Sequence, residues 1–227
     1  MLINPDSPVD KPETEQMVVI HQALRREFGL LPALVAAVPD TDAGRARAIG
    51  DHLALVLAVL HGHHEAEDDL LWPLLRQRVP LRKELVDVME QQHQVVADTI
   101  HAIQADLPAW TARGSVAERD RIATALRSLD AALVEHLDLE EREILPLLHE
   151  NVTVPEWLAP QHHAVEHGPK SLSGRMTVAG LILEDATPPQ RAWFMSVLPP
   201  PARALWRLVG ARRYAAHVRE IRAVASR

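Results

Sequence analysis

The chain has 227 residues, a formal net charge of −7 and no cysteine. This length allows a large buried core, and the lack of cysteine excludes disulfides, iron-sulfur clusters and thiol catalysis. The negative charge argues against nucleic acid as a partner. Because aromatic residues are few while Ala and Leu abound, the composition favours helices over strands, and we expect an all-α fold.

The N-terminal residues lack a basic segment followed by an apolar one. No later apolar run approaches the roughly 20 residues of a membrane span. The sequence therefore predicts a soluble, cytoplasmic protein.

The first predicted helix starts near Asp10, with Pro12 in its first turn, and ends at the turn residues 39–42. His21 lies on the apolar face of this helix, which is expected to face the core. Pro32 is expected to kink it.

The second predicted helix carries His63 and Glu67 on its apolar stripe. His64 and Asp68 have the same spacing about 100° further around the helix, so the spacing alone leaves two registers open. The segment from His63 to Pro73 recurs as His136 to Pro146, with the skeleton His-x3-Glu-x4-(Trp/Leu)-Pro-Leu-Leu. This repeat favours His63 over His64, and we expect outer hydrogen-bonding or solvated roles for His61, His64, Glu65 and Asp69.

The third predicted helix opens at Pro80 and carries His93 on its apolar face, and a capping box of Ser115 and Glu118 opens the fourth. His21 precedes His63 by 42 residues, and His93 precedes His136 by 43. The repeating unit is therefore a helical hairpin that occurs twice, and helices that project ligands inward are how bundle cores hold two metals.

Six polar side chains replace core residues in these helices, and they are the candidate ligands: His21, His63, Glu67, His93, His136 and Glu140. The alternative is a buried His and Glu network without metal, but such a network would be costly to desolvate without a cation. Imidazole and carboxylate together suit iron, manganese or zinc. The six divide into two sets of His, His and Glu, which predicts two metals with each Glu placed to bridge them.

With these motifs, the sequence resembles the hemerythrin-like family of HHE cation-binding domains over about residues 13–150. The resemblance implies an up-and-down four-helix bundle with two iron ions bridged by carboxylates, held by the six residues above. On this basis we expect a bundle over residues 1–150 and a helical extension over 151–227 packed on it.

The sequence departs from the oxygen-carrying members of that family at two places. Where they have a second third-helix His it has Ala97, and its fourth-helix carboxylate follows His136 after four residues rather than five. The pattern is closer to the bacterial branches that handle nitric oxide, peroxide or damaged iron centres, although the cysteine-bearing segment of some repair members is absent. Unless another side chain fills the gap at Ala97, both metals are expected to accept exogenous ligands, which favours oxidation chemistry over storage.

Two functions follow from the resemblance. The first is a di-iron protein that reacts with dioxygen, peroxide or nitric oxide in stress handling; the second is a non-catalytic module that binds oxygen or iron for storage or sensing. No catalytic acid, nucleophile or substrate pocket separates them, because the metal does most of this chemistry. Enzymatic activity and a redox partner therefore stay open.

After Pro155 the helical segments shorten, and we expect them to pack on the bundle rather than form a separate core. His162, His163 and His167 are interpreted as surface residues, with a lid or outer hydrogen-bonding role as the alternative. Residues 199–227 carry seven Arg and one acidic residue, Glu220, which leaves a charge of −13 on the rest. This basic tail is expected to dock on the acidic bundle; binding to an anionic membrane surface is the alternative.

Overall fold

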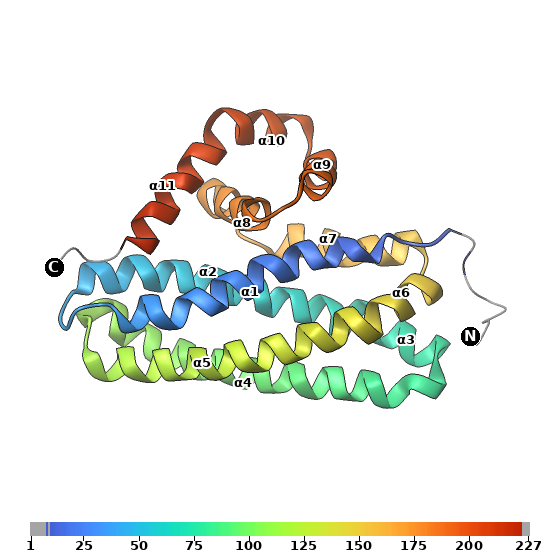
Figure 1. Ribbon diagram of the computed structural model, residues 1–227, viewed down its shortest axis with the longest axis horizontal. Coiled ribbons are helices and arrows are strands. Elements are labelled where there is room, and N and C mark those ends of the chain that lie inside the picture. The colour runs from blue at the N-terminus through green and yellow to red at the C-terminus, as the bar shows by residue number, and fades with distance from the viewer. Residues whose placement is uncertain (1–7, 9, 224–227) are drawn as a thin grey trace.

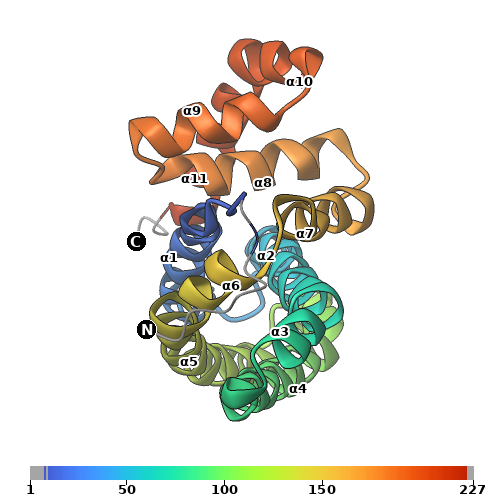
Figure 2. The same ribbon diagram turned by 90° about the vertical axis from the view of Figure 1, so that its right-hand side faces the viewer.

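The computed structural model describes residue 8 and residues 10–223, and within them the only regular secondary structure is helical. Four long helices form the body: α1 (Met17–Ala36), α2 (Ala43–Leu70), α4 (Lys83–Arg113) and α5 (Val116–Leu139) (Figure 1). Helix α1 packs against α2 and α5, and α4 packs against the same two helices. Figure 2 shows the four arranged in a ring around a shared core.

The core consists of two apolar clusters that follow one another along the bundle. The larger contains Leu60, Val96 and Leu133, and the smaller contains Trp72, Met89 and Ile144. In α2, His63 and Glu67 lie between Leu60 of the larger cluster and Leu71 of the smaller one. In α4, His93 lies between Met89 of the smaller cluster and Val96 of the larger one. Apolar packing therefore closes the site along the bundle axis in both directions.

The two copies of the repeat end with the same interruption. Helix α2 stops before α3 (Trp72–Arg78), and α5 passes through a π-helical turn (Glu140–Ile144) into α6 (Leu145–Asn151). Pro73 and Pro146 stand in the first turns of α3 and α6, where a proline costs no hydrogen bond. A short 3₁₀ turn, Pro80–Arg82, then leads from α3 into α4.

Two local expectations from the sequence differ from the structure. Helix α1 begins at Met17 after a 3₁₀ turn (Thr14–Gln16), not near Asp10; it includes Pro32 and ends at Ala36. Ser115 does occupy the position before α5, but its side chain makes no capping hydrogen bond. Capping boxes are found instead at Thr153 with Glu156, which open α7 (Val154–His167), and at Thr187 with Gln190.

The C-terminal part forms further short helices along one side of the bundle (Figures 1 and 2). They are α7 (Val154–His167), α8 (Leu172–Glu184), α9 (Pro188–Val197), α10 (Pro200–Leu205), a π-helical turn (Trp206–Gly210) and α11 (Ala211–Arg222). Helix α7 contacts α2, and α8 contacts α1. Leu181, Trp206 and Tyr214 belong to the same apolar cluster as the bundle core, so these helices have no separate core of their own.

A buried polar network joins α1 and α2 to the last helix. Glu27 and His52 are 2% and 4% exposed, and His52 Nε2 lies 2.9 Å from Glu27 Oε2. His217 Nε2 lies 3.0 Å from His52 Nδ1, and Arg222 donates to Glu27. Within the basic tail, Arg222 thus reaches an acidic group of the bundle, whereas four other arginines are exposed: Arg207, Arg212, Arg213 and Arg219.

Over the part of the chain that the structure describes, no helix combines the length and the apolar character needed to cross a bilayer.

Candidate metal centre

Four imidazoles meet in the bundle core as two pairs, and each pair comes from one hairpin. His21 Nε2 lies 3.2 Å from His63 Nε2, and His93 Nε2 lies 3.3 Å from His136 Nε2. His21 and His136 are fully buried, and His93 is 4% exposed. The structure therefore brings together the four histidines that the repeat singled out.

Two carboxylates lie between these pairs. Glu67 approaches His63 through Oε1 at 3.3 Å and His93 through Oε2 at 3.6 Å. Glu140 Oε2 lies 3.4 Å from His21 Nε2 and 3.6 Å from His136 Nε2. Each carboxylate thus touches one imidazole of each pair, which is the placement that a ligand bridging two cations needs.

The carboxylates are the least satisfied groups of the core. Both are fully buried, and within the described residues none of their four oxygens has a hydrogen-bond partner. Buried polar atoms are rarely left unpaired because the loss of hydration is costly. Burial and the neighbouring Glu140 raise the pKa of Glu67 well above its usual value. This arrangement lacks positive charge, and a cation would supply it.

Two of these imidazoles, those of His63 and His136, are held in the neutral form that binds metals. Burial and the neighbouring imidazoles lower the pKa of His63 well below its usual value and that of His136 to about 2. A neutral imidazole keeps a lone pair on the nitrogen that faces the centre. The donor set therefore fits a metal better than it fits a hydrogen-bonded network.

Outer partners orient three of the rings. His21 Nδ1 lies 2.9 Å from Glu141 Oε1, His93 Nδ1 lies 2.7 Å from Asp68 Oδ1, and His136 Nδ1 lies 3.1 Å from Gln92 Oε1. When the outer nitrogen donates its proton to an acceptor, the inner Nε2 is left free to bind. Asp68, one of the residues of the second register, has this orienting role.

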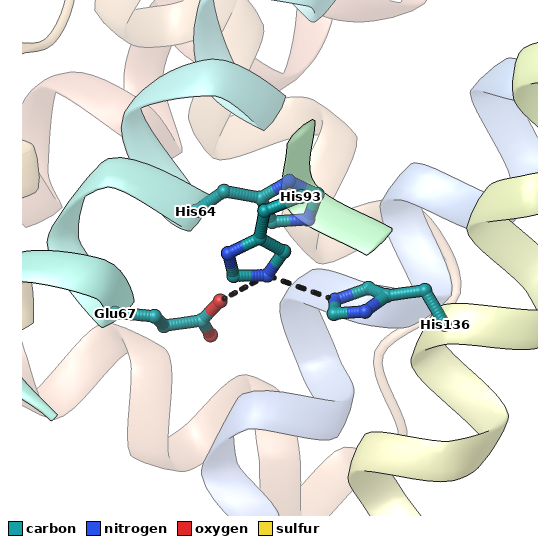
Figure 3. Close-up of side chains that lie close together, drawn as sticks. All are labelled: His64, Glu67, His93 and His136. Carbon is teal, nitrogen blue, oxygen red and sulfur yellow. Dashed lines mark hydrogen bonds and ion pairs between the residues drawn. The ribbon is translucent and has the colours of Figure 1, made fainter. Parts of the chain in front are cut away.

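His64, for which the sequence predicts an outer hydrogen-bonding or solvated role, lies among the buried donors. It is 4% exposed rather than solvated, its ring stacks on His93 with centroids 4.0 Å apart, and it lies 4.9 Å from the ring of His136. Figure 3 shows His64 and Glu67 reaching from α2 toward His93 on α4 and His136 on α5. A fifth imidazole therefore joins the cluster.

With His64 included, the donors form two unequal sets. One set is His64, Glu67, His93 and His136; the other is His21, His63, Glu67 and Glu140. Within each set the donor atoms lie within 4.8 Å of one another, and donors on opposite sides of one cation, each about 2.1 Å away, are about 4 Å apart. The sets thus have the size of coordination shells, one with three imidazoles and one with two.

This inequality changes the expectation that was based on Ala97. Ala97 is half-buried beside His93, and it contributes no donor. The side chain that fills the gap comes from α2, namely His64, and not from the C-terminal helices. A cation held by His93 would therefore not be short of a ligand, and the two donor sets do not support equal openness at both positions.

The π-helical turn begins at Glu140, four residues after His136. Such turns insert one extra residue into a helix and are frequent at functional sites. Here His136 and Glu140 both face the core, and the next residue, Glu141, still reaches His21. Two consecutive carboxylates thus contact the same ring: Glu140 approaches His21 Nε2 on the inner side, and Glu141 approaches His21 Nδ1 on the outer side.

The histidines of α7 lie outside the cluster. His162 and His167 are exposed, and His163 Nε2 lies 3.9 Å from Glu65 Oε2 of α2. The chain does double back along the bundle, because α7 packs on α2. It brings His163 to the outer side of α2 and not to the buried donors.

Comparison with known proteins gives one match. The family model described as the hemerythrin HHE cation-binding domain matches residues 13–148, more than half of the chain. No curated protein and no solved structure matches the chain. The matched range contains every donor of both sets and ends before α7.

Proposed function

Because the chain belongs to the hemerythrin family of HHE cation-binding domains, we propose that it holds two iron ions bridged by Glu67 and Glu140 and binds dioxygen, peroxide or nitric oxide there. Two buried carboxylates without hydrogen bonds, each between two imidazole pairs, carry this proposal. The contacts of α1, α2, α4 and α5 around one core support the up-and-down four-helix arrangement for this site. Manganese and zinc suit the same donors and are the alternatives to iron.

The chain's own residues would divide the work of the site unequally. Because Glu140 contacts both His21 and His136, five donors surround the position of His64, His93 and His136, and four surround the position of His21 and His63. Bound iron would supply the electrons and the open coordination position that a small oxidant requires. We therefore place the exogenous ligand on the side of His21 and His63.

The apolar clusters on both sides of the donors exclude bulk water along the bundle axis. Exclusion of water strengthens the attraction between the carboxylates and bound cations and limits side reactions. Arg25 donates to Glu141, the hydrogen-bond partner of His21 Nδ1. His21 and Arg25 together lower the pKa of Glu141 against the effect of burial, so the ionised carboxylate can accept the proton of His21 Nδ1 and orient the ring.

The second candidate function is reversible binding of oxygen for storage or sensing. The observation that favours it is His64, because a position with three imidazoles has less room for an exogenous ligand. Unequal openness is what reversible carriers in this family rely on, so the structure weakens the preference for oxidation chemistry that Ala97 suggested. Stress handling by peroxide or nitric oxide consumption stays the first proposal.

Metal analysis of protein purified without added metal tests the centre. We expect about two irons per chain, with a parallel loss in His63→Ala and His136→Ala and parental content in His101→Ala, an exposed control on α4. Normal iron in the first two variants would contradict the assignment.

Anaerobic reduction followed by exposure to oxygen separates the two functions. Prompt irreversible oxidation, or catalytic loss of added peroxide, supports reaction. Oxygen uptake that reverses under vacuum supports the carrier or sensor.

A further inference from the structure

A cleft of about 370 Å³ opens between α2 and α4 and ends at the buried donors. His64 and His93 form its inner end. His61, Glu65 and Asp69 are exposed at its outer end. The cleft therefore connects solvent to one side of the metal centre.

The charges that line the cleft all have one sign. Four carboxylates contribute to its wall: Glu65, Asp68, Asp69 and Glu90. No Lys or Arg is among the described residues that line it. Asp68 contacts His93, and Glu90 is paired with Arg76. At the mouth, Glu65 lies 3.9 Å from His163 Nε2 and, like Asp69, has no contact with Lys or Arg among the described residues.

An acidic surface by itself marks no site, but the inner end of this cleft holds a donor without a partner. His64 is 4% exposed, and its Nε2 has no hydrogen-bond partner within the described residues. A path lined with carboxylates thus ends at an unpaired metal-binding nitrogen.

We propose that this cleft is the route by which a divalent cation, Fe²⁺, reaches the centre, with Glu65 and Asp69 attracting it and His64 receiving it. The inference rests on the proposed di-iron function and adds where the metal enters. The cleft ends at the position already crowded by three imidazoles, which suits metal delivery better than binding of a small oxidant. Its negative charge would also repel anions.

Electrostatic attraction of this kind acts on the rate of association and is screened by salt. Neutralising Glu65 and Asp69 should therefore slow metal uptake without changing the number of ions finally bound. The test mixes metal-free full-length protein anaerobically with Fe²⁺ and measures free Fe²⁺ with a chromogenic chelator at timed intervals. Trp72, whose ring centroid lies 5.9 Å from that of His93, provides a second readout through quenching of its fluorescence.

The double variant Glu65→Gln with Asp69→Asn should take up Fe²⁺ about tenfold more slowly at low ionic strength, the low end of electrostatic steering, and approach the parent at high salt. The control, Asp51→Asn with Asp120→Asn, removes the same charge from exposed positions. Asp51 lies 14 residues from Glu65 on α2, or about 21 Å along the helix. This control variant should take up Fe²⁺ at the rate of the parent.

Ala97→Leu tests the route by volume rather than charge, because Ala97 lines the cleft. It should slow uptake at every salt concentration while the protein still folds and finally binds the parental amount of iron. If both variants load at the parental rate and the parent still binds two irons, the cleft is not the route although the centre stands. If the parent binds no iron, the proposed function fails and this inference fails with it.

Discussion

At the scale of single residues, Glu67 and Glu140 have opposite effects on the stability of the metal-free protein and on its binding of cations. Two buried carboxylates without hydrogen bonds destabilise the metal-free fold, whereas the same oxygens attract cations. The same two carboxylates therefore lower the stability of the metal-free protein and give it affinity for cations. A variant that removes one of the two charges should separate these effects.

Glu67→Gln should leave the metal-free protein at least as stable as the parent, because the amide replaces a carboxylate that burial already disfavours. The variant should lose most of the stabilisation that iron gives the parent, which is about 2.7 kcal/mol at a hundredfold excess over Kd. Calorimetric melting with and without iron measures both. Glu135→Gln on the exposed face of α5 is the control, and a Glu67→Gln variant that keeps the full gain would exclude Glu67 as a ligand.

His64→Ala should open the position that His93 and His136 serve. We expect azide titration of the iron-loaded protein to show a stoichiometry that rises from one to two per chain, because the removed imidazole vacates a coordination position. The total iron content should stay close to that of the parent. Equal azide stoichiometry in the variant and the parent would show that His64 does not bind the metal.

The repeat pointed to the candidate donors that occur in both of its copies, and it did not point to His64, which occurs in only one copy. His63 and His136 occupy equivalent positions before Pro73 and Pro146, so each copy supported the other. The second copy has Leu137 where the first has His64, and no internal comparison pointed to that residue. His64 lies about 100° away from His63 around α2; it reaches the centre because His93 on α4 lies on that side, which only the packing of α2 on α4 reveals.

At the scale of elements, two glycines show opposite requirements. Gly114 ends α4 with φ +67°, and a Cβ added there would lie 2.7 Å from the backbone carbon of Asp42. Gly62 lies inside α2, one residue before His63, and a Cβ there would meet nothing within 4 Å. One glycine is needed for the turn between helices, and the other weakens a helix.

Gly114→Ala should destabilise the protein by about 2 kcal/mol, since a left-handed conformation costs a residue with a Cβ and the backbone of Asp42 must move. Gly62→Ala should stabilise it by about 0.5–1 kcal/mol through the lower entropy of the unfolded chain. Chemical denaturation of the two metal-free variants measures both changes. Effects of the same sign would contradict this account of α2 and α4.

Helix identity was readable from the sequence, whereas some helix ends were not. Apolar periodicity and proline positions predicted the long helices because both are local. The π-helical turn at Glu140 has no local signal, and the start of α1 at Met17 follows a 3₁₀ turn in which Thr14 donates to the carbonyl of Leu145. Such a contact joins residues far apart in the chain, so it is invisible to spacing.

At the scale of the whole molecule, Glu27 links the C-terminal helices to the bundle. Burial alone would raise the pKa of Glu27, but hydrogen bonds from His52 and Arg26 bring it down from 4.5 to about 2. A carboxyl group whose pKa is lower in the folded state stabilises the fold fully above its unfolded pKa. That stabilisation is lost as the pH falls from about 4.5 toward about 2.

Glu27→Gln should lower the free energy of unfolding by about 2 kcal/mol at pH 7, because charge-assisted hydrogen bonds from Arg26 and Arg222 are lost. The difference from the parent should stay constant above pH 4.5 and shrink below it. Denaturation series at several pH values measure this dependence, with Glu135→Gln as the exposed control. If the difference in free energy of unfolding between the parent and Glu27→Gln grew as the pH fell, this account of the network would be wrong.

The division of the donors between two hairpins also fixes when the site can form during synthesis. The first hairpin holds His21, His63, His64 and Glu67, and it lacks Glu140 and the imidazoles of the second. A ribosome must therefore translate the chain beyond residue 136 before the set of His64, Glu67, His93 and His136 is complete, and beyond residue 140 before the other set is complete. Because every donor precedes α7, all of the donor segments leave the ribosome before the C-terminal helices do.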